Sequence, residues 1–134
     1  MRLQGQCYCG SVRFEAQGDP IVKGQCYCRE CQYVAGGAPN NFVLMPADGF
    51  VFTAGDPKSF TRSDLEHPVT RDFCPECGTH LATRLKVLPA VVVKVGVLVD
   101  PENFEPQIAI HVADKQPYHN IPAHLAQFER LPPM

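Results

Sequence analysis

Seven cysteines in three groups are the residues of this sequence whose type and spacing best suit them to chemistry. The first group is Cys7 and Cys9, the second is Cys26, Cys28 and Cys31, and the third is Cys74 and Cys77. Cysteine thiolates bind zinc, which takes four donors in a tetrahedral arrangement. The grouping therefore predicts metal ligation, with two zinc ions per chain, one structural and one catalytic.

The first and third groups together supply four donors for the structural ion. Side chains two residues apart on an extended strand point to the same face, so Cys7 and Cys9 present their sulfurs together. Cys74 and Cys77 have zinc-knuckle spacing and are followed by Gly78, where the chain must turn tightly around a metal. The pairing predicts a closed site that ties the start of the domain to its middle.

The second group offers three thiols and no fourth cysteine. Three protein ligands and an open position are the arrangement of a catalytic zinc. One alternative is a closed site completed by a distant histidine, for which the candidates are His67, His80 and His111. A second alternative is disulfide bonding, which the odd cysteine count and the tight C-x-C spacing disfavour.

Arg29 lies inside the three-cysteine segment and is the one basic residue singled out by its position. It is a candidate catalytic residue that offsets thiolate charge or holds a substrate carboxylate, and a solvent-facing loop arginine is an equal alternative. The glycine-rich stretch 36–40 follows the same segment. A plain turn into the next strand is favoured there over a substrate-binding loop.

Composition indicates one globular domain that spans residues 1–134. The net charge is −2, and the twelve Lys and Arg residues are scattered, which argues against nucleic-acid binding. The most apolar run, Ala90 to Val99, is short and contains Lys94, so no membrane span is expected. The absence of an apolar leader, together with reduced cysteines, favours a cytoplasmic location.

Extended structure dominates the hydrophobic pattern. Val12, Phe14 and Ala16 alternate with polar residues, which is the period of a half-buried strand. Further strands are expected at 42–45, 50–53, 59–62, 69–73, 80–84, 90–99 and 107–112. Only the segment Pro122 to Phe128 has a helical pattern. The sequence thus predicts a mainly β fold of short antiparallel sheets with at most one short C-terminal helix.

Four motifs together resemble the glutathione-dependent formaldehyde-activating enzyme family, which includes S-(hydroxymethyl)glutathione synthase and centromere protein V. They are the segment from Cys7 to Phe14, the three-cysteine cluster, the segment from Phe73 to Leu81, and the tail from Ile110 to Val112. The resemblance implies a β-tent fold pinned by zinc. It also implies that Cys7, Cys9, Cys74 and Cys77 bind the structural ion, and that Cys26, Cys28 and Cys31 hold the catalytic ion.

The chemistry that fits an open three-thiolate zinc is activation of a thiol, which then adds to an aldehyde carbon. The family resemblance implies a carbon–sulfur lyase or synthase acting on formaldehyde and a small-molecule thiol such as glutathione. The alternative is a non-catalytic, zinc-stabilised binding module with both metal sites closed. The state of the fourth position at the three-cysteine site distinguishes the two functions.

Overall fold

Strands of two to seven residues are the main regular elements of the computed structural model, which describes residues 1–133. The strands are β1 Arg2–Gln6, β2 Arg13–Gln17, β3 Val22–Cys26, β4 Asn40–Pro46, β5 Phe50–Ala54, β6 Lys58–Thr61, β7 Thr70–Phe73, β8 His80–Arg84, β9 Ala90–Lys94, β10 Ile108–Ile110 and β11 Ala126–Gln127. The helical elements are the α-helix α1 Arg29–Val34 and the short 3₁₀ turns Ala47–Gly49, Val95–Val97, Pro101–Asn103 and Val112–Asp114. The prediction of a mainly β fold is confirmed.

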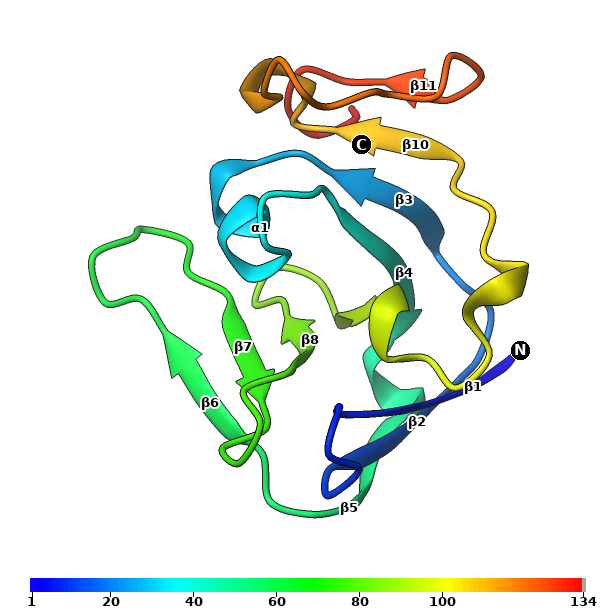
Figure 1. Cartoon of the computed structure of the whole chain (residues 1–134), viewed down its shortest axis with the longest axis vertical. Helices are drawn as coiled ribbons and strands as arrows, with labels where there is room; N and C mark the ends of the chain where they lie inside the picture. The colour runs from blue at the N-terminus through cyan, green and yellow to red at the C-terminus, as the bar shows by residue number, and fades with distance from the viewer. Residues whose placement is uncertain (134) are drawn as a thin grey trace.

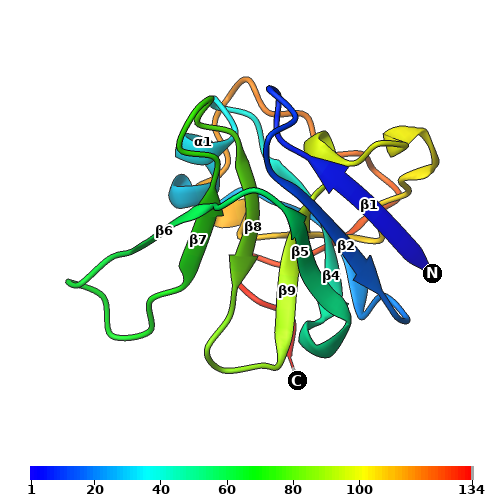
Figure 2. The same ribbon diagram turned by 90° about the horizontal axis from the view of Figure 1, so that it is seen from below.

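Within residues 1–133 the strands form two sheets (Figure 1). The smaller sheet has the order β1-β2-β5, and the larger has the order β11-β10-β3-β4-β9-β8-β7-β6. Neighbouring strands pair antiparallel except β10, which runs parallel to both β3 and β11. Strands β6 and β7 lie on the opposite side of the molecule from β1 (Figure 2).

The two sheets enclose the main core. Phe14 on β2 is 1% exposed and packs in one buried cluster with Met45, Leu81 and Val93 of the larger sheet. Gly5 on β1 lies opposite Phe14, and a Cβ atom at Gly5 would stand 2.2 Å from the phenyl ring. The glycine is therefore needed for β1 to lie over this ring, a close approach that alternation alone does not reveal.

The predicted C-terminal helix is wrong. Residues 122–128 form a turn followed by β11, and the Phe128 amide donates to the carbonyl oxygen of Ala109 at 2.9 Å. The α-helix of the described residues is instead α1, which is six residues long. Helices this short are stabilised by tertiary contacts rather than by propensity, so the pattern at 122–128 could be overridden by pairing with β10.

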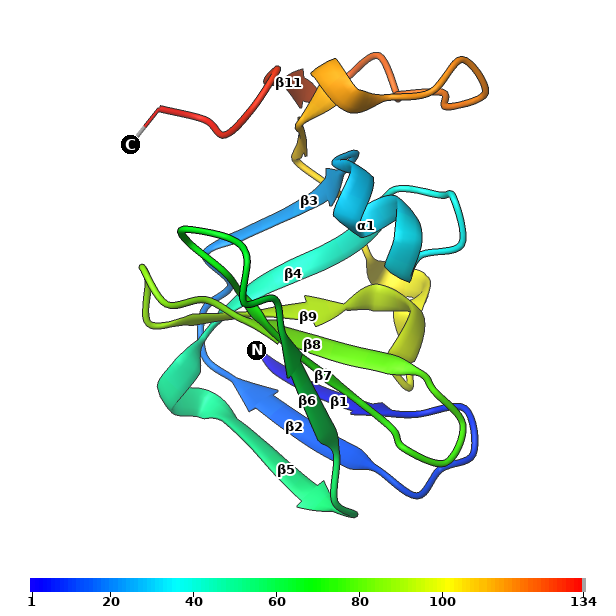
Figure 3. The same ribbon diagram turned by 90° about the vertical axis from the view of Figure 1, so that its left-hand side faces the viewer.

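Parallel pairing of β3 with β10 brings the C-terminal segment over the three-cysteine region. The amide of Tyr27 donates to the carbonyl oxygen of Ile110 at 3.0 Å, and Tyr27 is buried against Ala109 and Leu125. This segment lies beyond β3 and α1, at the end of the molecule opposite the β1-β2-β5 sheet (Figure 3). In the part of the chain that the structure describes, no helix has the length and hydropathy to span a membrane.

Candidate metal centres

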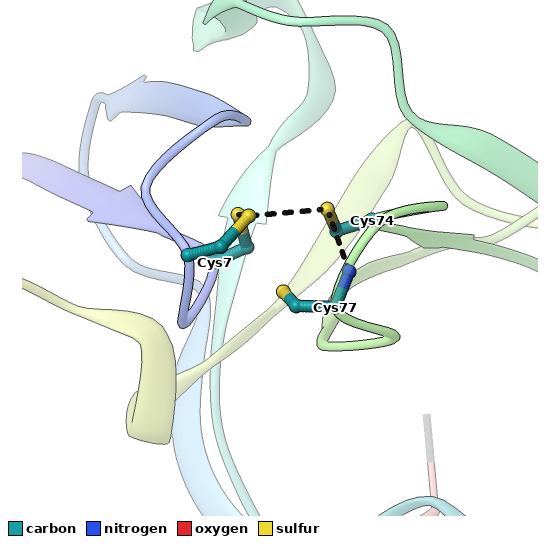
Figure 4. Close-up of side chains that lie close together, drawn as sticks. Cys7, Cys74 and Cys77 are labelled. Atoms are coloured by element: carbon teal, nitrogen blue, oxygen red, sulfur yellow. Dashed lines mark hydrogen bonds between the residues drawn. The ribbon is translucent and has the colours of Figure 1, made fainter.

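Cys7, Cys9, Cys74 and Cys77 bring their sulfur atoms together, all within 4.8 Å of one another. The Sγ atoms of Cys7 and Cys9 are 3.6 Å apart, and those of Cys9 and Cys74 are 3.8 Å apart across 65 residues of chain. A tetrahedral zinc with Zn–S distances of about 2.3 Å has edges of about 3.8 Å between its sulfurs. The donor set therefore fits a zinc ion, and Figure 4 shows Cys7, Cys74 and Cys77 facing one another.

Two tight turns aim these four sulfurs inward. Gly10 follows Cys9 with φ 81°, and Gly78 follows Cys77 with φ 77°, a region in which residues with a side chain are strained. The amide of Cys77 donates to the sulfur of Cys74 at 3.5 Å, which helps to orient that sulfur. The cluster joins the loop after β1 to the loop between β7 and β8, so a bound ion would link the two sheets.

Two hydroxyl groups that the sequence analysis did not identify support this cluster. Ser11 Oγ lies 3.1 Å from the sulfur of Cys9. Thr79 Oγ1 lies 3.2 Å from the sulfur of Cys77 and accepts a hydrogen bond from the amide of Tyr8 at 3.1 Å. Its hydroxyl hydrogen is thus free for the sulfur, and this contact is the first cause that lowers the pKa of Cys77 to about 5.

Cys26, Cys28 and Cys31 form the second cluster, again with sulfur atoms within 4.8 Å of one another. Cys26 ends β3, Cys28 caps the start of α1, and Cys31 lies in the first turn of the helix. The sulfur of Cys28 accepts the amide of Cys31 at 3.4 Å. Cys26 and Cys31 are buried, whereas Cys28 is half-buried and gives the cluster its solvent-facing side.

None of the three candidate histidines belongs to this three-cysteine group in residues 1–133. His67 is exposed beside Glu66, and His80 lies on β8 against Phe73. His111 directly follows β10 in the left-handed conformation, with φ 54°. The described donor set is therefore three cysteines, and all seven cysteines of the chain are free of disulfides.

The thiols of the second cluster polarise one another. The pKa of Cys28 is lowered to about 2, first because the thiol of Cys26 is hydrogen-bonded to it, and the same contact raises the pKa of Cys26. The pair therefore favours a thiolate at Cys28 even without a metal. Three cysteine sulfurs within 4.8 Å of one another are a donor set that fits zinc.

Gln32 holds the three-cysteine segment in place. Its side chain is buried, and Nε2 donates to the carbonyl oxygens of Tyr27 at 2.8 Å and of Asp114 at 3.0 Å. Oε1 accepts from Arg29 and from Gln116 Nε2. A glutamine with this many partners ties α1 both to the end of β3 and to the C-terminal segment, a role that its position in the sequence does not indicate.

Arg29 makes its contacts with other residues of α1. Its side chain is exposed, hydrogen-bonded to Gln32, and lies with its guanidinium carbon 5.0 Å from the centre of the Tyr33 ring. Stretch 36–40 is a turn into β4, as favoured from the sequence, and the Gly37 carbonyl oxygen accepts the hydroxyl of Tyr118 at 2.9 Å. The contacts of Arg29 are therefore those of a helix-surface residue.

A pocket of about 240 Å³ lies beside α1. It is lined by Glu30, Tyr33, Val34, Phe60, Arg62, Leu65, Val69, Arg71 and His80. Glu30 stands 3.7 Å from both Arg62 and Arg71. The pocket thus combines an apolar lining with two guanidinium groups that share a single carboxylate.

Comparison with known proteins adds a family and a fold. The family model for the glutathione-dependent formaldehyde-activating enzyme matches residues 2–114. Among solved structures, the chain is similar to a crystal structure of a Rhodobacter sphaeroides protein, with a TM-score of 0.59 and 20% identity over 75% of this chain and 93% of that one. A likeness at that identity shows the fold alone. No curated relative matches the sequence.

Proposed function

This chain belongs to the glutathione-dependent formaldehyde-activating enzyme family, and from that membership we propose that it is a zinc-dependent carbon–sulfur lyase. Its substrates are a small-molecule thiol such as glutathione and formaldehyde or a related aldehyde. The chain acts as a single zinc-binding domain over residues 1–134. Such chemistry needs reduced thiols, and the cytoplasm provides them.

The difference between the two cysteine clusters carries this proposal. One cluster offers four sulfurs, which saturate a tetrahedral ion, and the other offers three. Cys7, Cys9, Cys74 and Cys77 accordingly take the structural role. Cys26, Cys28 and Cys31 take the catalytic role, with the fourth position left for substrate.

A zinc ion held by these three cysteines would act as a Lewis acid that lowers the pKa of an incoming thiol. The thiol sulfur attacks the aldehyde carbon, a carbon–sulfur bond forms, and the thiol proton ends on the aldehyde oxygen. In reverse the same bond breaks and the proton returns to sulfur. The chain's own residues hold the reactants: α1 presents Cys28 and Cys31, and Gln32 fixes the helix.

The pocket beside α1 suits the part of a peptide thiol that lies away from the reacting sulfur. Arg62 and Arg71 can exchange Glu30 for a substrate carboxylate, since their 3.7 Å contacts with Glu30 are longer than a charge-assisted hydrogen bond. Arg29, the candidate from the sequence, stacks on Tyr33, a residue that also lines this pocket, and has the contacts of a surface residue of α1.

Paired substitutions of Cys28 and Cys74 test the proposal. Cys28→Ala is expected to leave a folded protein that retains one zinc ion and binds no glutathione. Cys74→Ala, the matched control in the four-cysteine cluster, is expected to lose cooperative unfolding. Retention of full glutathione binding by Cys28→Ala overturns the catalytic assignment, and unfolding of Cys28→Ala favours a closed, purely structural site.

A further inference from the structure

Lys94 is a buried lysine at the end of β9. It is 6% exposed and lies opposite Phe42 of β4. The residues of β9 that precede it are apolar. Among residues 1–133 its Nζ atom has no hydrogen-bond partner and is shielded from solvent. A buried ammonium normally has a paired anion, because its desolvation is costly.

The anionic groups that attract this ammonium are the cysteines of the three-cysteine cluster. Cys31, Cys26 and Cys28 all act electrostatically on Lys94 and favour its charged form. Burial is the larger effect and lowers the pKa of Lys94 to about 8, so the side chain is mostly protonated at neutral pH. Phe42, the residue opposite Lys94, packs in one buried cluster with Cys26 and Cys31, so this cation lies in the part of the protein that holds the sulfurs.

Other cationic side chains lie near the cluster. His111, which is half-buried, acts electrostatically on Cys28. Arg29 is exposed and stacks on Tyr33. Arg71, which repels Lys94, lies 3.7 Å from Glu30. His80 interacts electrostatically with Lys94. Burial lowers the pKa of His80, so its imidazole is mostly neutral at neutral pH. Lys94 is left as the unpaired buried positive charge of this region in the described residues.

A buried cation near the cysteines would offset the negative charge of the metal site. Three thiolates on a dication leave a net charge of −1, and a fourth thiolate from substrate makes it −2. Opposite charges in a partly desolvated site attract much more strongly than in water. A fixed cation behind the cysteines therefore favours entry of the thiol as its anion.

We propose that Lys94 is the positioning residue that compensates the charge of a substrate thiolate at the three-cysteine site. The inference rests on the proposed function, because it requires a thiol to occupy the fourth position. It assigns this role to Lys94 instead of Arg29. It also predicts that the lysine acts on the sulfur of the thiol and not on a distant carboxylate.

The test measures binding of two thiols to the zinc-loaded protein between pH 6 and 9. Glutathione carries carboxylates, whereas 2-mercaptoethanol is neutral apart from its thiol. Lys94→Met is expected to weaken both by a similar factor of roughly tenfold or more, and to move the pH midpoint of binding upward. Lys94→Arg, which keeps the charge, is expected to restore most of the affinity, and Lys86→Met is the control for loss of an exposed lysine.

The possible outcomes separate the two proposals. If the wild-type protein binds neither thiol, the proposed function fails and this inference fails with it. If it binds both thiols and Lys94→Met binds them equally well, only the role of Lys94 is wrong. A loss confined to glutathione also overturns the inference, because it makes Lys94 a carboxylate ligand. If Lys94→Met does not fold, equal pH midpoints in wild type and Lys94→Arg support charge compensation, and failure of Lys94→Arg to bind thiol contradicts it.

Discussion

The side-chain amide of Gln32 donates a hydrogen bond of 2.8 Å to the carbonyl oxygen of Tyr27, closing the short segment on which Cys26, Cys28 and Cys31 lie. The same amide reaches Asp114, 82 residues further along the chain. The geometry of the three-cysteine cluster therefore depends on a buried glutamine and on the C-terminal segment, and not on the cysteine spacing alone.

Gln32→Ala should weaken metal binding at the three-cysteine cluster and leave the four-cysteine cluster unchanged. The substitution removes the hydrogen bonds to the buried carbonyl oxygen of Tyr27 and the half-buried one of Asp114, at a cost of about 2–4 kcal/mol. Competition with a chromophoric zinc chelator would then remove one ion at lower chelator concentration and the second as in wild type. Gln127→Ala on the exposed β11 is the control, and equal loss of both ions would contradict the assignment of Gln32 to one site.

Thr79→Val should weaken the four-cysteine cluster instead. The change removes a hydroxyl 3.2 Å from the sulfur of Cys77 and leaves the amide of Tyr8 without its acceptor. Groups that support metal ligands in this way are worth about 10- to 100-fold in metal affinity. The same chelator competition measures the effect, with Thr61→Val on the exposed β6 as control. An unchanged affinity of both sites would show that the hydroxyl does not act on the metal.

Asp72→Asn should destabilise the fold by about 3 kcal/mol. Its side chain is 2% exposed and accepts from Arg84 Nε at 2.8 Å and from Ser59 Oγ at 2.6 Å, which joins β6, β7 and β8. Urea unfolding of the zinc-loaded protein measures the loss. The exposed pair of Asp64 with Arg62 is the control, and Asp64→Asn should change stability by less than about 1 kcal/mol.

His80 should make stability fall at acid pH. Burial lowers its pKa below the ordinary value of 6.5, so below that pH the unfolded chain binds more protons than the folded one. Stability therefore rises with pH up to about 6.5 and is lost as the pH falls through the lowered pKa. The difference in unfolding free energy between His80→Gln and wild type should change over this range. A flat difference for His80→Gln would contradict the burial argument.

The sequence predicts those features whose cause is local. The C-x-C and C-x-x-C spacings identify the cysteines of both clusters, because a few residues decide where such sulfurs point. Alternation at residues 12–16 identifies β2. Features set by distant partners are not predicted. α1 forms where Cys28 caps it and Gln32 anchors it, although six residues have little helical stability of their own.

The burial of Lys94 is a further feature that depends on residues distant in the sequence. A single lysine in an apolar run is visible in the sequence, but the strand order β4-β9-β8 is what buries it near the cysteines. Arg29 is adjacent to the cysteines in sequence and yet faces Tyr33. Nearness along the chain therefore does not decide where a charged side chain points, since the side chain of a residue on a helix points according to its place in the turn.

A calorimetric titration of glutathione into the zinc-loaded protein, in two buffers of different ionisation enthalpy, is the sharpest test of whether a thiol binds at the three-cysteine site. At a pH where the free thiol is mostly protonated, a thiol that enters an open three-cysteine site must release its proton. We expect binding whose heat depends on the buffer in proportion to about one proton released per chain. No binding with two zinc ions retained, or binding with no proton release, would contradict it.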